Sequence, residues 1–296
     1  MVGAGQRDLG AVLSMLVGAV MISTSAPWVK VADVEPTVSA FYRMAIGAVG
    51  LIVLCLLQRR RLWLDARYAL RFVPVALFFA LDLYLWHRSI VYIGPGLATL
   101  LANFQIFVLA TIGWLFYREK VGLNFAVGVL AAFAGIWILV GIDWGSLGPQ
   151  YRLGVLLGLL TAAAYSSFIL SMRAAQGAAS SLSPPANLAL MSVFCAAMLA
   201  ALTLYEGHGF AVPNSKTWGA LLAYGLLCQV VGWMLITRAM PRLPAAIVGL
   251  FLLLQPALSF LWDIIFFARP TDGGDLVGAL LVLLGIYIAN RRSRSP

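Results

Sequence analysis

The sequence predicts an all-α integral membrane protein with ten transmembrane helices, arranged as two inverted five-helix repeats around a central cavity. Composition is the first observation behind this prediction, because 62% of the 296 residues are hydrophobic and only 10% are charged. An ordinary soluble domain has about one-quarter charged residues, so a soluble globular fold is excluded. The other two observations are the regular recurrence of long apolar runs and the similarity of the second half of the chain to the first.

Ten apolar runs are each long enough to form a helix that crosses the membrane, which needs about 20 residues. They are too long for the strands of a membrane barrel, and helices satisfy their own backbone polar groups in lipid. In chain order the expected spans cover residues 9–29, 36–57, 70–92, 95–117, 121–141, 152–173, 184–205, 217–240, 244–267 and 274–290.

Proline, glycine and charged residues bound these runs. One arginine precedes the first run and no clear small-residue cleavage site follows it, so we interpret this run as a span rather than a removable signal. In the first half the next four spans begin or end at Pro36, Leu70, Pro95 and Gly141. In the second half the boundaries fall at Arg152, Pro184, Lys216, Pro244 and Arg291.

Lysine and arginine residues are unevenly distributed between the two sides of the membrane. If the N-terminus is cytoplasmic, 14 of the 20 basic residues fall on the cytoplasmic side and five on the other, while Arg43 lies within a span. Basic residues accumulate in cytoplasmic loops, so both termini are predicted to be cytoplasmic. The net charge of +9 therefore reflects topology in the lipid bilayer, and we expect no nucleic-acid partner. The bias of arginine over lysine is consistent with a bacterium, hence with the bacterial cell inner membrane.

The second half of the chain repeats the first. A shift of 150 residues places Arg88 on Arg238, Gln105 on Gln255, Gly128 on Gly278 and Gly135 on Gly285. Shifts of 144 and 149 align the first span with the sixth and Pro36 with Pro185. We therefore predict repeat units at residues 1–145 and 146–296 within one integrated membrane domain. Because five is odd, the second unit enters the membrane from the opposite face, as in many secondary transporters that work by alternating access.

Several loose motifs resemble those of a known family. They are Arg43, the stretch 116–120, the glycine-spaced segment from Gly128 to Gly135, and the second-half echoes Gln255-Pro256 and Gly278 to Gly285. With them, nearly the whole chain resembles the drug/metabolite transporter superfamily in its ten-helix EamA-like branch. The resemblance implies export of small metabolites, often amino acids, and is nearest to bacterial aromatic amino-acid exporters. One departure is Arg269, which stands opposite Glu119 where the family usually repeats the acid, so no symmetric role of that acid is expected.

Two charged residues lie inside predicted spans, where a charge is unfavourable unless it is paired and faces the bundle interior. Arg43 is about 10 Å from the outer surface and Asp82 about 18 Å from the inner one, at 1.5 Å per helical residue. In a hydrocarbon core about 30 Å thick, these depths nearly coincide. We predict that Arg43 and Asp82 approach each other as a structural or gating ion pair, and a contact with the substrate is the alternative.

Polar and aromatic residues near mid-span form the candidate substrate-binding set. Its members are Thr24, Asp82, Tyr84, Trp86, His87, Thr99, Asn103, Tyr165, Ser166, Gln229, Trp233 and Gln255. Uncharged hydrogen-bonding groups with aromatic walls suit a zwitterionic or neutral metabolite. For any single serine or threonine, a bond to its own or a neighbouring helix is the more common role. His87 has three open roles, which are a packing hydrogen bond, a place in the cavity and proton coupling.

Two further predictions concern a kink at a proline and close packing of helices at small residues. Pro256 is expected to kink the ninth span and leave a broken backbone beside the site. Small residues in the fifth and tenth spans, among them Gly128, Gly135, Gly278 and Gly285, are expected to pack the halves or the protomers of a homodimer. The sequence leaves a monomer and a homodimer open.

Enzyme motifs are missing from the chain. It contains no H-E-x-x-H, no G-x-S-x-G, no paired aspartate motif and no nucleotide-binding loop. We therefore expect no catalytic residues, no metal and no cofactor, and a secondary transporter with a small-molecule substrate. A channel or a non-transport scaffold remains the alternative.

Cys55, Cys195 and Cys228 all lie in spans and are expected to be unpaired.

Overall fold

The computed structural model describes residues 9–117, 122–141, 144–176, 182–243 and 245–290, and within these ranges it contains helices and no strand. The first half comprises α1 (Leu9–Ser23), α2 (Ser25–Val31), α3 (Pro36–Leu57), α4 (Ala66–Leu70), α5 (Phe72–Ile93), α6 (Pro95–Ala102), α7 (Gln105–Tyr117), α8 (Leu123–Ile136) and the π-helix η1 (Trp137–Gly141). The second half comprises α9 (Pro149–Gln176), α10 (Pro184–Tyr205), α11 (Ser215–Ala223), the π-helix η2 (Tyr224–Gly232), α12 (Trp233–Ala239), the 3₁₀ turn η3 (Met240–Arg242), α13 (Ala245–Phe267) and α14 (Gly273–Asn290).

The protein is an all-helical multi-pass membrane protein. Eight of its described helical segments are long and apolar enough to cross a membrane, and two shorter apolar segments, Leu123–Leu139 and Gly273–Ala289, correspond to the fifth and tenth predicted spans. Arg118, Glu119 and Lys120 of the family-like stretch lie outside the described residues, as do Arg7 and the basic residues after Asn290. Large apolar side chains such as Leu57, Leu130 and Phe266 are exposed on the outer surface, as lipid-facing side chains are.

The helices do not break at the proline where the sequence predicted a break. The predicted break at Pro256 is wrong, because α13 runs through that residue without interruption, and membrane helices tolerate an internal proline. Instead, the first span breaks at Thr24, between α1 and α2, and the fourth breaks at Asn103 and Phe104, between α6 and α7. The eighth span changes to a π-helix over Tyr224–Gly232. π-Helical turns are rare and are frequent at functional sites.

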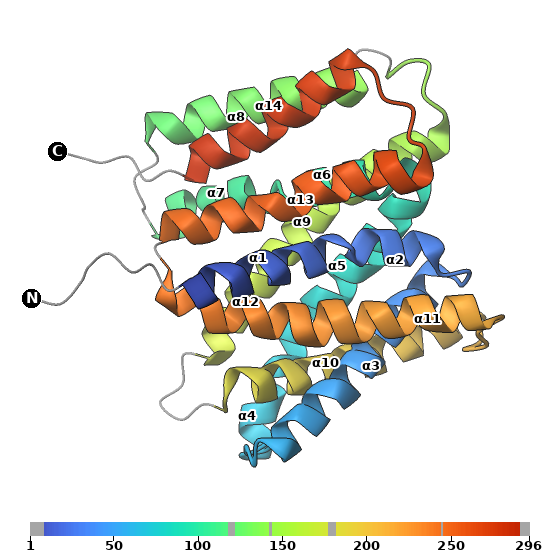
Figure 1. The fold of residues 1–296 in the computed structure, drawn as a ribbon, viewed down its shortest axis with the longest axis vertical. Helices are drawn as coiled ribbons and strands as arrows, with labels where there is room; N and C mark the ends of the chain where they lie inside the picture. The colour runs from blue at the N-terminus through green and yellow to red at the C-terminus, as the bar shows by residue number, and fades with distance from the viewer. Residues whose placement is uncertain (1–8, 118–121, 142–143, 177–181, 244, 291–296) are drawn as a thin grey trace, which may run out of the picture.

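The packing between the halves has the two-fold pattern of inverted repeats. The helix α5 packs on α9, and its counterpart, η2 with α12, packs on α1. Likewise α13 packs on α1, and its counterpart, α6 with α7, packs on α9. The pair of α5 and α10 has its mate in η2 with α3. Three further pairs, α3 with α10, α8 with α14 and α6 with α13, join equivalent helices (Figure 1). Every major contact between the halves thus has a mate in which the two halves exchange roles.

Glycines bring α8 and α14 into close contact. A Cβ on Gly128 would lie 2.5 Å from the carbonyl oxygen of Gly285, and one on Gly135 would lie 2.5 Å from that of Gly278. The contact is reciprocal, because the repeat relates Gly128 to Gly278 and Gly135 to Gly285. These glycines therefore pack one half of the molecule against the other, close to the axis that relates them.

The two ends of the bundle differ. Figure 1 shows that α1 begins and α14 ends at the same end of the bundle, which we call the terminal side. The opposite end, where α2 ends and α11 begins, is the far side. The loop after α3 lies on the terminal side, and the loop between α10 and α11 lies on the far side (Figure 1).

Candidate functional site

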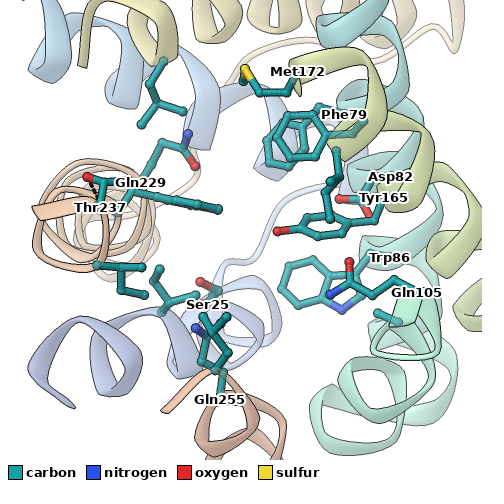
Figure 2. Close-up of a pocket in the computed structure, with 18 of the residues that line it drawn as sticks. Ser25, Phe79, Asp82, Trp86, Gln105, Tyr165, Met172, Gln229, Thr237 and Gln255 are labelled. Carbon is teal, nitrogen blue, oxygen red and sulfur yellow. Dashed lines mark hydrogen bonds between the residues drawn. The ribbon is translucent and has the colours of Figure 1, made fainter. Parts of the chain in front are cut away.

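A cavity of about 440 Å³ lies between the two halves (Figure 2). Its lining comes from α1, α2, α3, α5, α6 and α7 with their junction in the first half, and from α9, α10, η2, α12, η3 and α13 in the second. The pair of α8 and α14 contributes no lining residue. The cavity is therefore built jointly by the halves, while the glycine-packed pair stands apart from it.

Most of the predicted site residues line this cavity. They are Asp82, Trp86, Thr99, Asn103, Tyr165, Gln229, Trp233 and Gln255, together with Arg43. Figure 2 shows Asp82, Trp86 and Tyr165 on one side of the space and Gln229 on the opposite side. The structure thus brings together residues from six of the ten predicted spans around one volume.

Four predicted site residues do not line the cavity, namely Thr24, Tyr84, His87 and Ser166. The Thr24 hydroxyl donates to the carbonyl of Met21, 2.6 Å away, and the Ser166 hydroxyl to the carbonyl of Ala162, 2.7 Å away. Both hydroxyls thus bond to their own helix region, the ordinary role of such residues in membranes. The Tyr84 ring lies against the guanidinium of Arg88, with 3.7 Å from Cζ to the ring centroid.

His87 is fully buried behind the cavity wall. Its Nδ1 lies 2.7 Å from the carbonyl oxygen of Leu83, and its Nε2 lies 3.2 Å from the hydroxyl of Tyr224. A carbonyl oxygen only accepts hydrogen bonds, so Nδ1 carries the proton in the neutral ring and Nε2 accepts from Tyr224. This arrangement matches the packing role among the three that the sequence left open.

Arg43 lies in the deep wall of the cavity and is 6% exposed. Its Nε donates to Oε1 of Gln229 at 3.0 Å, and its Nη1 donates to the hydroxyl of Tyr224 at 2.8 Å. No direct ion pair between Arg43 and Asp82 is present in the described part of the chain, although the guanidinium and the carboxylate lie near enough to interact electrostatically. The π-helix η2 explains the difference, since it supplies both Gln229 and Tyr224 to the guanidinium.

Some buried polar atoms in the cavity wall have no hydrogen-bond partner among the described residues. They include Oε1 of Gln105, Nε2 of Gln229 and Nε1 of Trp233. Buried polar atoms without a protein partner are uncommon and call for an explanation such as a bound ligand or water. An acceptor and two donors are therefore available to a molecule in the cavity.

The candidate substrate-binding set predicted from the sequence lacks some of the lining residues. Ser25, Phe79, Gln105 and Ser259 also line the cavity. Helix periodicity could have found two of them, because Phe79 precedes Asp82 by three residues and Ser259 follows Gln255 by four. The repeat could have found Gln105, which is the counterpart of Gln255.

The cavity opens on the terminal side. Arg173, Gln176 and Pro184 line it at that end and are exposed. At the opposite end of the cavity Arg43 and Asp82 are buried. A small molecule can therefore enter from the terminal side in this conformation.

A cluster formed by Arg88, Glu206 and Thr37 helps to close the far side, and we call it the Arg88 cluster. Nη2 of Arg88 donates to Oε1 of Glu206 at 2.5 Å, and the hydroxyl of Thr37 donates to Oε2 of the same carboxylate at 2.7 Å. Arg88 also donates to the Thr37 hydroxyl at 3.1 Å. Glu206 ends α10, whereas the corresponding end of α3 carries Gln58. The cluster thus joins the halves on one side with an ion pair.

A second contact between the halves on the far side centres on Asp263 and Arg269. Asp263 accepts from the backbone N–H of Gly96 at 3.0 Å, and Arg269 donates to the carbonyl of Ile93 at 3.1 Å and to Asp263 at 3.5 Å. Gly94 has φ of 87°, and a Cβ there would lie 2.6 Å from Asp263. Only glycine suits this turn, which brings the start of α6 against the carboxylate.

Comparisons with known proteins agree with this architecture. A family model described as the EamA-like transporter family matches residues 9–141 and 152–291, one match in each half. The uncharacterized transporter YvbV of Bacillus subtilis (strain 168) is 24% identical over 266 residues, which is 88% of this chain and 84% of the relative. An uncharacterized transporter of Archaeoglobus fulgidus is 24% identical over 269 residues, covering 87% of this chain and 90% of the relative.

A solved structure shares the fold. It is a protein crystal structure that aligns with a TM-score of 0.66 at 19% sequence identity, covering 97% of this chain and all of the other. At this identity the likeness concerns the fold alone.

Proposed function

Because this chain belongs to the EamA-like transporter family and not to a family of enzymes, we propose that it is a secondary transporter that exports small metabolites. Amino acids, including aromatic ones, are the favoured substrates. In this proposal the protein works by alternating access in the bacterial inner membrane, with both termini in the cytoplasm.

The single observation that carries the proposal is the shared cavity, open on one side and closed on the other by contacts between the halves. The pairs of helices that pack between the halves have mates in which the halves are exchanged. If the two halves exchanged conformations, the terminal side would close and the far side would open. This is alternating access from one architecture. A cavity open to the terminal side would then be the state in which an exporter loads its substrate.

The cavity suits a molecule of amino-acid size. Its volume of about 440 Å³ falls within the usual range for small-molecule sites, about 300 to 1,000 Å³. Apolar and aromatic walls surround a few hydrogen-bonding groups, among them Gln105, Gln229 and Gln255. Such a site supports binding of a zwitterionic metabolite with an apolar body.

Transport of a labelled aromatic amino acid into proteoliposomes tests the proposal. We expect counterflow of the label against unlabelled amino acid, and a competition screen of the common amino acids would rank the substrates. Liposomes without protein serve as the control. Voltage-driven currents without counterflow would identify a channel, and neither counterflow nor currents would support the scaffold alternative.

A further inference from the structure

We propose that Asp82 and the aromatic side chains around it form a subsite that binds the ammonium group of the substrate. The ligand class is an organic amine in its cationic form, attached to an apolar body. This inference rests on the proposed function, because it takes the cavity to be the place where substrate binds.

The carboxylate of Asp82 is buried and has no direct hydrogen-bond or ion-pair partner among the described residues. Asp82 is 6% exposed and lines the cavity. No residue in the described ranges forms a hydrogen bond or an ion pair with its side chain. A charge inside a membrane protein is unfavourable unless a partner compensates it. Arg43 lies near enough to act on this carboxylate electrostatically, but a direct hydrogen bond to it is left to the contents of the cavity.

Arg43 does not supply that partner in this structure. Its guanidinium donates to Gln229 and Tyr224, and it lies over the Tyr224 ring at 4.8 Å. Gln229 faces Asp82 across the open space (Figure 2). The hydrogen bonds of Arg43 thus go to η2, and its Cζ lies 5.6 Å from the ring centroid of Phe79, which leaves the oxygens of the Asp82 carboxylate without a direct donor.

Aromatic rings surround the same carboxylate. Phe79 and Trp86 lie three residues before and four residues after Asp82, on one face of α5, and both line the cavity. On α9, Tyr165 and Phe168 continue the wall, with 4.6 Å between the ring centroids of Phe79 and Phe168 and 5.3 Å between those of Tyr165 and Phe168. Figure 2 shows Phe79, Tyr165 and Trp86 beside Asp82.

The combination of a carboxylate with aromatic rings selects for an organic cation. Ring faces attract ammonium groups, most strongly where water is excluded, and a carboxylate adds a charge-assisted hydrogen bond. A hard metal ion such as calcium needs six to eight oxygen ligands, and the described residues contain no cluster of three acidic, histidine or cysteine side chains. A carboxylate or phosphate ligand would bring its negative charge against that of Asp82, although Arg43 lies in the same wall.

A pair of probes with the same apolar body tests the subsite. Phenethylamine carries an ammonium group, and 3-phenylpropionate carries a carboxylate. Isothermal titration calorimetry at pH 7 would measure the equilibrium binding of each probe to the purified full chain in detergent. We expect the amine to bind the wild-type protein at least about tenfold more tightly than the acid, a factor equal to about 1.4 kcal/mol.

Two variants test whether Asp82 causes the preference for the amine. Asp82→Asn should remove the preference for the amine, whereas Asp33→Asn, a matched change at an exposed carboxylate outside the cavity, should keep it. Equal or tighter binding of the acid by the wild-type protein would overturn the proposal, and so would an Asp82→Asn protein that still prefers the amine. If Asp82→Asn does not fold, the wild-type comparison of the two probes decides alone.

The binding test and the transport test can fail independently of each other. Counterflow of an amino acid together with failure of the amine preference would leave the proposed function standing and remove the subsite. An amine preference without counterflow would leave the subsite as a binding site of a protein that does not carry its ligand.

Discussion

Arg43 links the cavity to the second half through its bonds to Gln229 and Tyr224. Tyr224 in turn bonds to His87, so three side chains behind the wall form one connected chain. Buried networks of this kind hold their members in fixed positions when every partner is satisfied. The guanidinium therefore sets the orientation of Gln229, whose side-chain nitrogen is left for a ligand.

Replacement of Arg43 by alanine should reduce transport with little change in protein abundance. Hydrogen bonds to charged groups contribute about 1.5 to 3 kcal/mol each, so we expect transport in proteoliposomes to fall by at least about tenfold. The exposed Arg67→Ala is the matched control and should transport normally. Loss of the folded protein together with transport would instead assign Arg43 a purely structural role.

His87→Gln should change stability and leave the pH dependence of transport unchanged. The ring is buried, bonded to Leu83 and Tyr224, and outside the cavity. Loss of one partner in a buried pair reduces stability by about 1 to 3 kcal/mol, which thermal unfolding in detergent would detect. His208→Gln, at the other histidine, is the control. A shifted pH profile in His87→Gln alone would revive the proton-coupling role.

The sequence predicts much of the site at the level of single residues, but not their contacts. Asp82, Trp86 and Gln229 line the cavity as expected, because a polar residue in a long apolar run has few other places to lie. The hydrogen-bond partners of Arg43 were not predicted, since depth in the membrane does not specify which helix lies beside it. Helix periodicity alone does not show that Tyr84 faces away from the cavity.

At the scale of helices, the reciprocal glycine contact holds α8 and α14 together. We expect Gly128→Ala to lower the melting temperature in detergent, because a new Cβ would collide with the backbone of α14. Overpacking of this kind usually costs about 1 to 3 kcal/mol. The control is Gly219→Ala on α11, where a Cβ would meet open space. Equal melting temperatures for the two variants would show that the helix pair can separate freely.

The number and order of the spans follow from hydropathy, but their interruptions do not. Averaged hydropathy does not change at Thr24 or at Asn103, where the first and fourth spans break. At Pro256 the sequence predicted a break that the structure does not contain, because α13 stays helical there. Both real breaks lie next to residues that line the cavity, Ser25 and Gln105. The helix breaks thus coincide in position with the cavity and not with the proline that local helix propensity would favour as a break.

At the scale of the whole molecule, alternating access requires the far-side contacts to open. The Arg88 cluster joins α3 and α5 to the end of α10, so it has to separate before the cavity can reach the far side. Two states of similar energy shift in population when a contact unique to one of them is weakened. Removal of the Glu206 charge should therefore favour the state that opens to the far side.

Thiol labelling measures this shift. In the Ser25→Cys protein, a membrane-impermeant maleimide should label the cavity from the terminal side and only slowly from the far side. Addition of Glu206→Gln should speed labelling from the far side by at least about tenfold, the factor that corresponds to about 1.4 kcal/mol.

The matched control for this experiment is Glu35→Gln, an exposed carboxylate on the same side with no capping bond. It should leave both labelling rates unchanged. Identical far-side rates in the two glutamine variants would show that the Arg88 cluster does not hold the far side closed.

The charges of this cluster are confined to one face of the molecule, because Gln58 stands where a symmetric partner of Glu206 would be. The side chains of Arg88 and Glu206 are 21% and 16% exposed, so dissolved ions reach them from one compartment alone. Screening by salt weakens such an attraction, though less than it would for fully exposed charges. We therefore expect this contact to weaken when the salinity rises on the far side, and to be unaffected by the salinity on the terminal side.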